Sequence, residues 1–474
     1  MKKLIPNILL IIFVFSMVIT NKSFSQNNNI SGIWNGSLKV SGIQLRIVFN
    51  ISKEDNGNYK ATMDSPDQGV KDIPVEEITF QENKIKMEMP ALRGEYNGTL
   101  GSDKNKIEGT WTQSGRSFQL DLKKSDKPTV LNRPQEPKKP FPYNSEDVTY
   151  ENNIAGNTLA GTFTYPESAG PFPAVILITG SGPQNRNEEL LGHKPFLVLS
   201  DYLTRQGIAV LRFDDRGIGK STGDFTSATS KDFATDVLAG VDYLKTRNEV
   251  NKNEIGLVGH SEGGLIAPMV AVKSPDVAFI VLMAGPGLPG DQILLMQSAL
   301  ISKAGGASDE DIEKSEKVNK KIYEILKNEP DSLKAHNEIV GIFTKYYNSL
   351  SEEDKEKAGD ENTALQMLKR VETPWFKQFL KYDPRPTLEK VTCPVLAING
   401  EKDLQVPAKE DLEAIKEALR KGGNKNFRTV ELKNLNHLFQ TAKTGAPTEY
   451  NTIKETIAPV ALKTMSDWIL GITK

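Results

Sequence analysis

Residues Asn253–Ala267, which read NEIGLVGHSEGGLIA, constrain the fold of this chain more than any other stretch. A short apolar run at residues 255–258 is typical of a strand, and helical spacing of apolar residues follows the motif. Between them, Gly259 and Gly263 flank Ser261 in the pattern G-x-S-x-G. A corner this tight needs glycines, because Cβ atoms beside the serine would meet neighbouring backbone. The pattern predicts an exposed nucleophile facing the first N–H groups of a helix; the alternative is a chance pentapeptide in a glycine-rich chain.

Length and charge set broad limits on the protein. A chain of 474 residues predicts two or three domains and a sizeable core. Its 59 basic and 61 acidic residues nearly cancel, which argues against nucleic acid or an anionic membrane as a partner. The oligomeric state stays open, and a homo-oligomer is among the options.

The N-terminus has the pattern of a secretory signal peptide over residues 1–25. Lys2 and Lys3 precede an apolar run at residues 8–19, and Ser23-Phe24-Ser25 then forms a small-x-small cleavage site before Gln26. An uncleaved membrane anchor is the alternative, but the run is short for a span, and no later stretch is long and apolar enough to cross a bilayer. We therefore expect a protein exported to the periplasm or secreted.

The cysteine and histidine content argues against disulfides and metal centres. Cys393 is the only cysteine, so no intrachain disulfide can form, and none is available for lipidation after the signal. Export without disulfides fits a periplasmic or secreted bacterial protein. No cluster of His, Cys, Asp and Glu has metal-ligand spacing, so we expect neither a metal nor another cofactor.

Residues 26–124 are predicted to form a small all-β module. Hydrophobic residues alternate with polar ones in short runs that are separated by turn signals, which favours an antiparallel sandwich or small barrel. Trp34 and Trp111 either form a ligand platform or close the end of a barrel, and the second interpretation is favoured. Residues 125–147 are rich in Pro and Lys and are predicted to be a stiff, solvated linker.

Residues 148–474 are predicted to form an α/β domain. Strand-like and helical runs alternate, which implies a mostly parallel sheet with helices on both faces. Residues 288–387 interrupt this alternation with helical periodicity and are predicted to be a helical cap. Near the end of the cap, Trp375, Phe376 and Phe379 either line a substrate pocket or pack the cap onto the sheet; both interpretations stay open.

A serine becomes a nucleophile only when a base takes its proton and an acid orients that base. The serine corner resembles the nucleophile elbow of the α/β-hydrolases, in which the acid and then the base follow the serine in the chain. His437 is the only histidine in the right position. The others precede the serine or lie in the presumed cap: His193, His260 and His336. Asp403 follows the preceding strand and is the predicted acid, with Glu401 as the fallback.

Backbone amides are expected to bind the oxyanion of the reaction. One donor is the amide of Glu262, directly after the serine. A second should come from the glycine-rich loop after an earlier strand, where Ser181 is the first choice and Gly182 the next. An ordinary glycine turn is the alternative.

The run Asp214–Ser221 follows a buried strand and contains glycines, but it lacks the spacing of a phosphate-binding loop. Its glycines are better explained as turns. Asp215 and Arg216 are interpreted as structural ion-pairing residues near the site.

From about Val148 to the C-terminus, the chain resembles bacterial α/β-hydrolase esterases of the serine aminopeptidase-like superfamily, above all exported carboxylesterases of the EstD type. The resemblance implies an α/β-hydrolase fold and hydrolysis of short acyl esters by the residues named above. Thr179-Gly180 departs from the His-Gly of many relatives. The segments that carry the resemblance are Thr179–Pro183, His193–Phe196, Asp214–Gly219, Gly259–Gly264, Ala397–Asp403 and Asn436-His437.

These observations predict a serine carboxylesterase that acts on a small-molecule ester. The first alternative is an aminopeptidase or acyl-peptide hydrolase of the same superfamily, which would need an acidic group in the cap to hold the substrate's amine; the many Glu and Asp residues of the cap leave this open. The second is not an enzyme: a glycan- or polymer-binding protein whose hydrolase domain has decayed.

Overall fold

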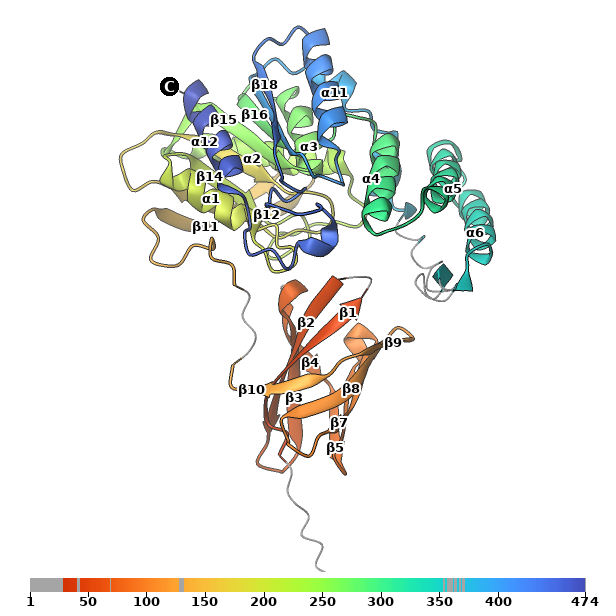
Figure 1. Cartoon of the computed structure of the whole chain (residues 1–474). Helices are drawn as coiled ribbons and strands as arrows, with labels where there is room; N and C mark the ends of the chain where they lie inside the picture. The colour runs from red at the N-terminus through yellow and green to blue at the C-terminus, as the bar shows by residue number, and fades with distance from the viewer. Residues whose placement is uncertain are drawn as a thin grey trace, which may run out of the picture.

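The computed structural model describes residues 29–40, 43–68, 70–127, 132–352 and 371–473, together with positions 354, 355, 361, 365 and 368. An N-terminal β module lies beneath a larger α/β domain, and cap helices lie to one side of that domain (Figure 1). The predicted signal peptide falls outside the described residues and stays a prediction. None of the helices in the described ranges has the length and apolarity needed to cross a membrane.

The N-terminal module is one antiparallel sheet of ten strands. The strand order is β4-β3-β2-β1-β10-β8-β7-β6-β5, and β9 pairs with β8. The two edge strands of this curled sheet, β4 and β5, are consecutive in the chain. Trp34 and Trp111 are buried in its core, so neither is an exposed platform. The all-β prediction is therefore confirmed. The strands are β1 (Gly32–Val40), β2 (Ile43–Lys53), β3 (Tyr59–Ser65), β4 (Val70–Val75), β5 (Glu77–Gln81), β6 (Lys84–Met89), β7 (Gly94–Leu100), β8 (Lys106–Gln113), β9 (Arg116–Gln119) and β10 (Leu122–Ser125).

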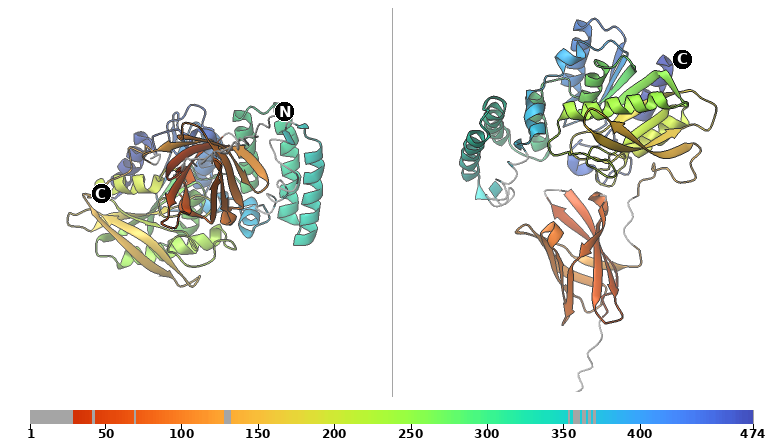
Figure 2. Two further views of the ribbon diagram at one scale, coloured as in Figure 1. Left: turned by 90° about the horizontal axis from the view of Figure 1, so that it is seen from below. Right: turned by 180° about the vertical axis from the view of Figure 1, so that it is seen from behind.

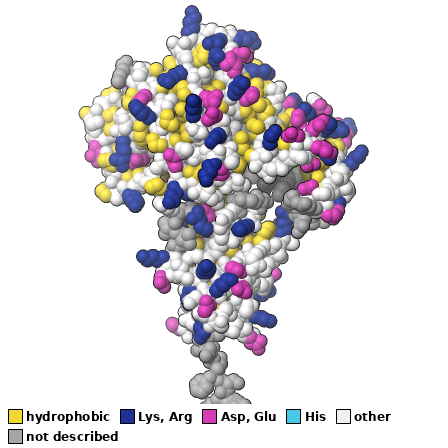
Figure 3. Space-filling model, viewed as in Figure 1, with side chains coloured by type: hydrophobic (Ala, Val, Ile, Leu, Met, Phe, Trp, Pro, Cys, Tyr) yellow, Lys and Arg dark blue, Asp and Glu magenta, His cyan; other side chains and the backbone are white. Residues whose placement is uncertain are grey.

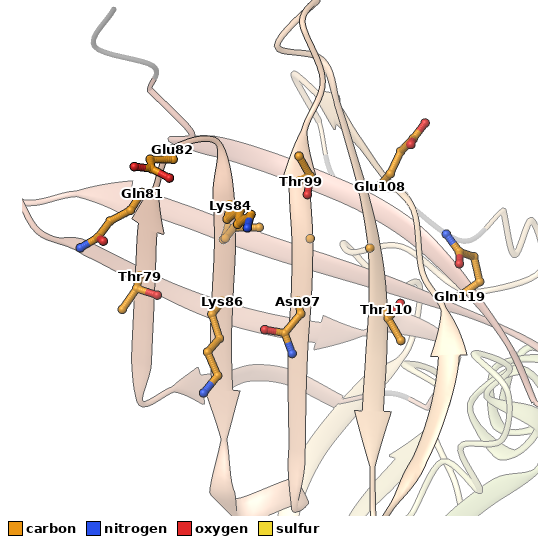
Figure 4. Close-up of a pocket in the computed structure, with 13 residues that line it drawn as sticks. Thr79, Gln81, Glu82, Lys84, Lys86, Asn97, Thr99, Glu108, Thr110 and Gln119 are labelled. Carbon is orange, nitrogen blue, oxygen red and sulfur yellow. The ribbon is translucent and has the colours of Figure 1, made fainter. Parts of the chain in front are cut away.

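The outer face of strands β5 to β8 is hollowed into a broad, open groove of about 800 Å³. Figure 4 shows that polar side chains line it. Thr79, Lys86, Asn97 and Thr110 form one cross-strand row of this lining. The groove is polar and has no aromatic residue in its lining.

The α/β domain is built on an eight-stranded sheet of order β11-β12-β14-β13-β15-β16-β17-β18. Strands β11 and β12 pair antiparallel, and the strands from β14 to β18 pair in parallel. Each strand-like run predicted from the sequence corresponds to one of these strands. Their bounds are β11 (Asn144–Asn152), β12 (Asn157–Tyr165), β13 (Phe172–Ile178), β14 (Ala209–Phe213), β15 (Val250–His260), β16 (Val277–Met283), β17 (Val395–Gly400) and β18 (Phe427–Leu432).

Helices cover both faces of this sheet. Helices α1 (Pro195–Arg205) and α12 (Pro459–Ile472) pack on one face. Helices α2 (Ser230–Thr246), α3 (Glu262–Ala271) and α11 (Ala408–Lys421) pack on the other, where α2 lies in front in the right-hand view of Figure 2. The predicted doubly covered, mostly parallel sheet is confirmed. The last helix begins at Pro459, and residues 453–458 before it form loop contacts.

The predicted cap is helical. It comprises α4 (Gly290–Ala304), α5 (Asp309–Asn328), α6 (Ser332–Asn348), α9 (Pro374–Lys381) and α10 (Arg385–Leu388). Ion pairs one turn apart run along α5, between Lys314 and Glu310, Lys317 and Glu313, and Lys320 and Glu316. Figure 3 shows acidic and basic side chains interspersed over this part of the surface. Such exposed pairs support the helix and keep it solvated.

The segment predicted as a solvated linker is bound to the α/β domain over part of its length. The Arg133 guanidinium donates hydrogen bonds to backbone carbonyls of two loops, those of Leu191, Gly192, Asn451 and Ile453, at 2.7–3.1 Å. The Gln135 side chain donates to Ile457 O and accepts from the Thr456 amide. Strand β11 begins at Asn144, inside the range predicted as linker. The composition was typical of a linker, but Arg133 supplies the donors that these loop carbonyls need.

The β module also contacts the α/β domain directly, since Asn451 Nδ2 donates to the carbonyl of Gln44 at 2.5 Å. Asn451 lies in the same loop that Arg133 holds. The module and the linker therefore meet at one loop of the α/β domain.

We expect Arg133→Ala to lower the free energy of unfolding by about 2 kcal/mol, because it removes several charge-assisted hydrogen bonds to part-buried carbonyls. Urea unfolding followed by intrinsic fluorescence would measure this. Lys138→Ala, at an exposed position of the same segment, is the matched control and should change little. Equal stabilities for the two variants would contradict the anchoring role.

Candidate active site

The predicted corner joins strand β15 to helix α3. Ser261 lies at the turn with φ +52° and ψ −117°, a conformation that non-glycine residues rarely adopt. A Cβ on Gly259 would lie 2.0 Å from Gly263 O, and one on Gly263 would lie 2.1 Å from Ile178 O. Both flanking positions therefore accept only glycine. The strain leaves Ser261 partly exposed at the carboxyl end of the sheet, between a strand and a helix N-terminus.

The structure brings Asp403 and His437 together at that end of the sheet. Asp403 follows β17, and His437 lies in the loop after β18. His437 Nδ1 is 2.7 Å from Asp403 Oδ2, and both side chains are buried. Asp403 Oδ1 accepts the amides of Gln405 and Val406 at 2.8 and 2.9 Å. Hydrogen bonds therefore hold both oxygens of the Asp403 carboxylate. Asp403 bonds to Nδ1 of His437 and leaves Nε2 for another partner.

Glu401, the fallback acid, is directed elsewhere. Its Oε2 accepts the backbone amide of Asn434 at 2.8 Å. Asp403 is therefore the carboxylate that contacts His437.

His260 connects the serine corner to the His437 loop. Its ring centroid lies 4.9 Å from that of His437, and its Nε2 is 3.0 Å from the His437 carbonyl. Because His260 directly precedes Ser261, this contact fixes the serine backbone next to the histidine. Ser261, His437 and Asp403 thus lie in one cluster.

The glycine-rich loop after β13 lies against the serine. A Cβ on Gly180 would be 3.3 Å from Ser261 Cβ. The Gly180 amide donates to Glu188 Oε1 at 2.8 Å, so it is occupied. Gly182 has a φ of +94°, and Ser181 between them is exposed. The loop therefore offers the next amides, those of the predicted donors Ser181 and Gly182, while Glu262 begins α3, where amides have no partner within the helix.

The Glu262 side chain points away from the solvent and joins the serine corner to the cap. Its Oε1 accepts from Ser230 Oγ at 2.5 Å and from Trp375 Nε1 at 2.7 Å. Burial raises the pKa of Glu262, and the two hydrogen bonds oppose that rise. Cap helix α9 is therefore hydrogen-bonded, through Trp375, to Glu262, the residue that follows Ser261.

Asp215 is not the ion-pairing residue that the sequence suggested. Its Oδ1 accepts from Thr179 Oγ1 at 2.8 Å and its Oδ2 from the Gln184 amide at 2.9 Å, and no cation of the described chain lies within salt-bridge distance. Burial raises its pKa to about 8. Asp215 instead holds both ends of the glycine-rich loop. Arg216 does pair, with Asp236 at 2.7 Å.

Next to this loop lies an enclosed cavity of about 10 Å³, close to the volume of one water molecule. Asp215, Glu262 and Phe233 line it together with Thr179 and Gly182. Ser261 is not among the residues that line this cavity.

The three cap aromatics have different environments. Trp375 bonds to Glu262 and stacks on Phe379 at 5.4 Å. Phe379 is buried and belongs to the core of the α/β domain, whereas Phe376 packs within the cap against Tyr323. The packing interpretation therefore accounts for Phe376 and Phe379, and Trp375 lies nearest the serine corner.

Sequence reasoning missed Glu188 and the part played by His260. His260 Nδ1 is 2.9 Å from Glu188 Oε1, and both residues are buried. His260 was set aside because it precedes the serine, and nothing marks Glu188 among its polar neighbours. His193 is not the base either. Its ring hydrogen-bonds with Thr456, Tyr450 and Gln440, and burial lowers its pKa to about 4. Within the described ranges, no group of three or more His, Cys, Asp or Glu could hold a metal ion.

Known proteins resemble the chain across this region. A family model described as "Serine aminopeptidase, S33" matches residues 195–338. Esterase EstD of Thermotoga maritima is 28% identical over 360 residues, which cover 75% of this chain and 74% of that protein. A putative hydrolase of Bacillus subtilis, YtaP, is 32% identical over 117 residues, or 21% of this chain and 39% of its own length.

Among solved structures, the esterase Pf2001 of Pyrococcus furiosus aligns with a TM-score of 0.39 at 20% identity. That alignment covers 65% of this chain and 89% of the other.

We expect Asp215→Asn to gain stability relative to wild type as the pH rises from about 5 to about 8. The raised pKa of Asp215 means that the folded protein binds more protons than the unfolded chain in this window, so the stability due to this group falls with rising pH. Asparagine keeps the shape without the ionisation. The difference should grow by at most about 1.4 kcal/mol per pH unit.

Urea unfolding at several pH values would measure this gain. Asp242→Asn, at an exposed position of α2, is the control and should follow wild type. Parallel pH profiles for wild type and Asp215→Asn would contradict the prediction.

Proposed function

Because the chain is an α/β-hydrolase of the carboxylesterase type, homologous to esterase EstD, we propose that it cleaves short-chain carboxylic esters through a Ser261–His437–Asp403 acyl-enzyme mechanism. The observation that carries this proposal is the Asp403–His437 hydrogen bond beside the strained Ser261 corner. Two buried, oriented groups next to an exposed serine form the geometry that nucleophilic acyl transfer needs.

In the proposed reaction, Ser261 Oγ attacks the ester carbonyl while His437 takes its proton. Asp403 holds Nδ1–H of His437, which leaves the other ring nitrogen as the base and stabilises the imidazolium that forms. The protonated His437 then donates its proton to the leaving alcohol. In the second half, His437 activates water, which releases the acid and restores Ser261.

The negative charge on the carbonyl oxygen is stabilised by the amides of Glu262 and Ser181, with Gly182 as the alternative second donor. The capture of the Gly180 amide by Glu188 supports this assignment, because it leaves the following amides as the donors of the loop. Fixed N–H groups that need no reorganisation are worth most at a developing oxyanion.

One feature supports a small acyl group. The cap is attached to the serine corner by the hydrogen bond between Trp375 and Glu262, which limits the space there. A groove of about 390 Å³ lies between α4 and the loop that carries Asp403, where Met296 and Leu300 face Leu404. This open groove is the more suitable side for the alcohol part of the ester.

Peptide hydrolysis is the second candidate, and the match to a serine aminopeptidase model favours it. An aminopeptidase needs a carboxylate that faces the substrate's amine. The carboxyls nearest the serine, Glu262 and Glu188, are instead buried and engaged by protein donors. This arrangement supports the esterase.

A binding protein with a decayed hydrolase domain is the third candidate. The polar groove on the outer face of the β module is where a glycan or polymer chain would bind. The intact geometry of the serine corner and of the Asp403–His437 pair argues against decay. We further propose that the protein is exported, on the strength of the signal-peptide pattern at residues 1–25.

We expect the protein that begins at Gln26 to hydrolyse p-nitrophenyl esters, with turnover highest at acetate to butyrate and falling for long acyl chains. Ser261→Ala should lower kcat by at least about 10⁴-fold and leave the unfolding transition unchanged, because only the hydroxyl is removed. An aminoacyl p-nitroanilide serves as the peptidase probe. Faster cleavage of the anilide would favour the aminopeptidase, and no turnover of either would favour the binding protein.

The choice between Asp403 and Glu401 has its own test. Asp403→Asn should lower kcat by about 10³–10⁴-fold, because the amide no longer holds His437 in the correct tautomer. Glu401→Gln should stay within about 3-fold of wild type, since Glu401 bonds to the Asn434 amide. The reverse ranking in ester hydrolysis would make Glu401 the acid.

A further inference from the structure

Behind the serine corner lies a second His–carboxylate pair, formed by His260 and Glu188. His260 Nδ1 is 2.9 Å from Glu188 Oε1, and both side chains are buried from solvent. Among the described residues, His260 is the only cation within salt-bridge distance of Glu188. Glu188 has a φ of +53°, so the loop holds it in a conformation that non-glycine residues rarely adopt. The loop therefore holds Glu188 against His260 in a strained backbone conformation.

The partners of His260 determine its protonation. Its Nε2 faces the carbonyl of His437, which can only accept a hydrogen bond, so Nε2 carries a proton. Its Nδ1 faces Glu188 Oε1, which already accepts the Gly180 amide. With Glu188 as a carboxylate, both ring nitrogens face acceptors, and only the imidazolium form donates to both. Burial lowers the pKa of His260, but the Glu188 charge and the His437 carbonyl outweigh burial and raise it.

The pair spans both halves of the proposed catalytic apparatus. On one side, Glu188 anchors the Gly180 amide at the start of the oxyanion loop. On the other, His260 holds the backbone of His437. Ser261 lies between them, covalently attached to His260. One buried ion pair thus sets the spacing of the nucleophile, the oxyanion donors and the base.

The charge of His260 also acts on His437 directly. The two rings are 4.9 Å apart, and the Glu188 carboxylate lies at the opposite nitrogen of His260. The positive end of the pair is therefore closer to His437 than the negative end. The other groups around His260 are Asp403, whose charge also favours the imidazolium, and the uncharged ring of Phe439 at 6.3 Å. The charge of His260 therefore acts on the His437 ring across this close contact.

We propose that Glu188 and His260 form a positioning ion pair that couples the oxyanion loop to the catalytic histidine, with His260 an imidazolium throughout the catalytic cycle. This inference rests on the proposed function, because it assigns a role to the groups behind the same serine. Neither residue touches the substrate; both act through Gly180 and His437.

The first experiment measures protonation without any substrate. In ¹⁵N-edited NMR of the full chain, His260→Gln assigns the His260 signals, since the protein has only four histidines. We expect both ring nitrogens of His260 in the wild type to be protonated over about pH 7 to 8, where an ordinary histidine is mostly neutral. A neutral ring in this range would overturn the proposal. This result does not depend on turnover, so failure of the esterase proposal and failure of this one are distinguishable.

The second experiment measures positioning. Glu188→Gln keeps the size of the side chain and removes the charge, so His260 loses its second proton. We expect kcat for p-nitrophenyl acetate to fall about 10- to 100-fold with KM within about 3-fold, because transition-state contacts are disturbed more than binding. Glu188→Asp, which retains the charge, should restore most of the wild-type kcat.

The chain supplies a control in a second His–carboxylate contact, which is partly exposed. His336 Nδ1 lies 2.8 Å from Glu372 Oε1 in the cap, away from the serine. Glu372→Gln should leave kcat unchanged. An unchanged kcat in Glu188→Gln would overturn the proposal, and if that variant does not fold, the wild-type NMR result decides.

Discussion

The close approach of backbone at the β15–α3 corner is the constraint on which the rest of the site depends. Gly259 and Gly263 bring strand and helix so near that a single Cβ at either position would overlap carbonyl oxygens. This contact forces Ser261 into a positive φ, and that conformation would relax if the surrounding elements did not hold it. The parallel register of β13, β15 and β16 fixes the strand, and the buried core beneath α3 fixes the helix. Catalytic geometry is thus a consequence of sheet packing.

Around this corner the protein buries several ionisable groups. Asp215, Glu188 and Glu262 each accept hydrogen bonds from the loop, the serine strand or the cap, and His260 pairs with Glu188. Donors offset the cost of burying a carboxyl, although Glu188 Oε2 has no hydrogen-bond partner among the described residues. The buried acids therefore serve as fixed attachment points: Asp215 for the loop, Glu262 for the cap and Glu188 for His260. Apolar packing could not specify these three orientations as narrowly.

The parts that could be predicted from sequence are those set by local spacing or by chain order. Alternation of short apolar runs located every strand of the large sheet, and the glycine spacing located the corner at Ser261. His437 was selected because the other histidines precede the serine or lie in the cap. Asp403 was selected because it follows a strand, and parallel strands bring their carboxyl ends to one edge of the sheet. The parts that could not be predicted depend on contacts between distant positions. Glu188 and His260 are 72 residues apart, and no local pattern links them.

Contacts between distant positions were also missed for the linker and the cap aromatics. Composition indicated the kind of element in each case, but not the residues that it contacts. A stretch rich in Pro and Lys is typical of a solvated linker, yet the donors of Arg133 are directed to carbonyls on two loops of the α/β domain. One of these loops, around Asn451, also contacts the β module at Gln44 and follows the His437 loop in the chain. The other, at Leu191 and Gly192, begins three residues after Glu188. Arg133 therefore bridges the segments that carry the two ends of the Glu188–His260–His437 chain of contacts. Through this arginine, the docking of the linker and the module is physically continuous with the geometry of the serine site.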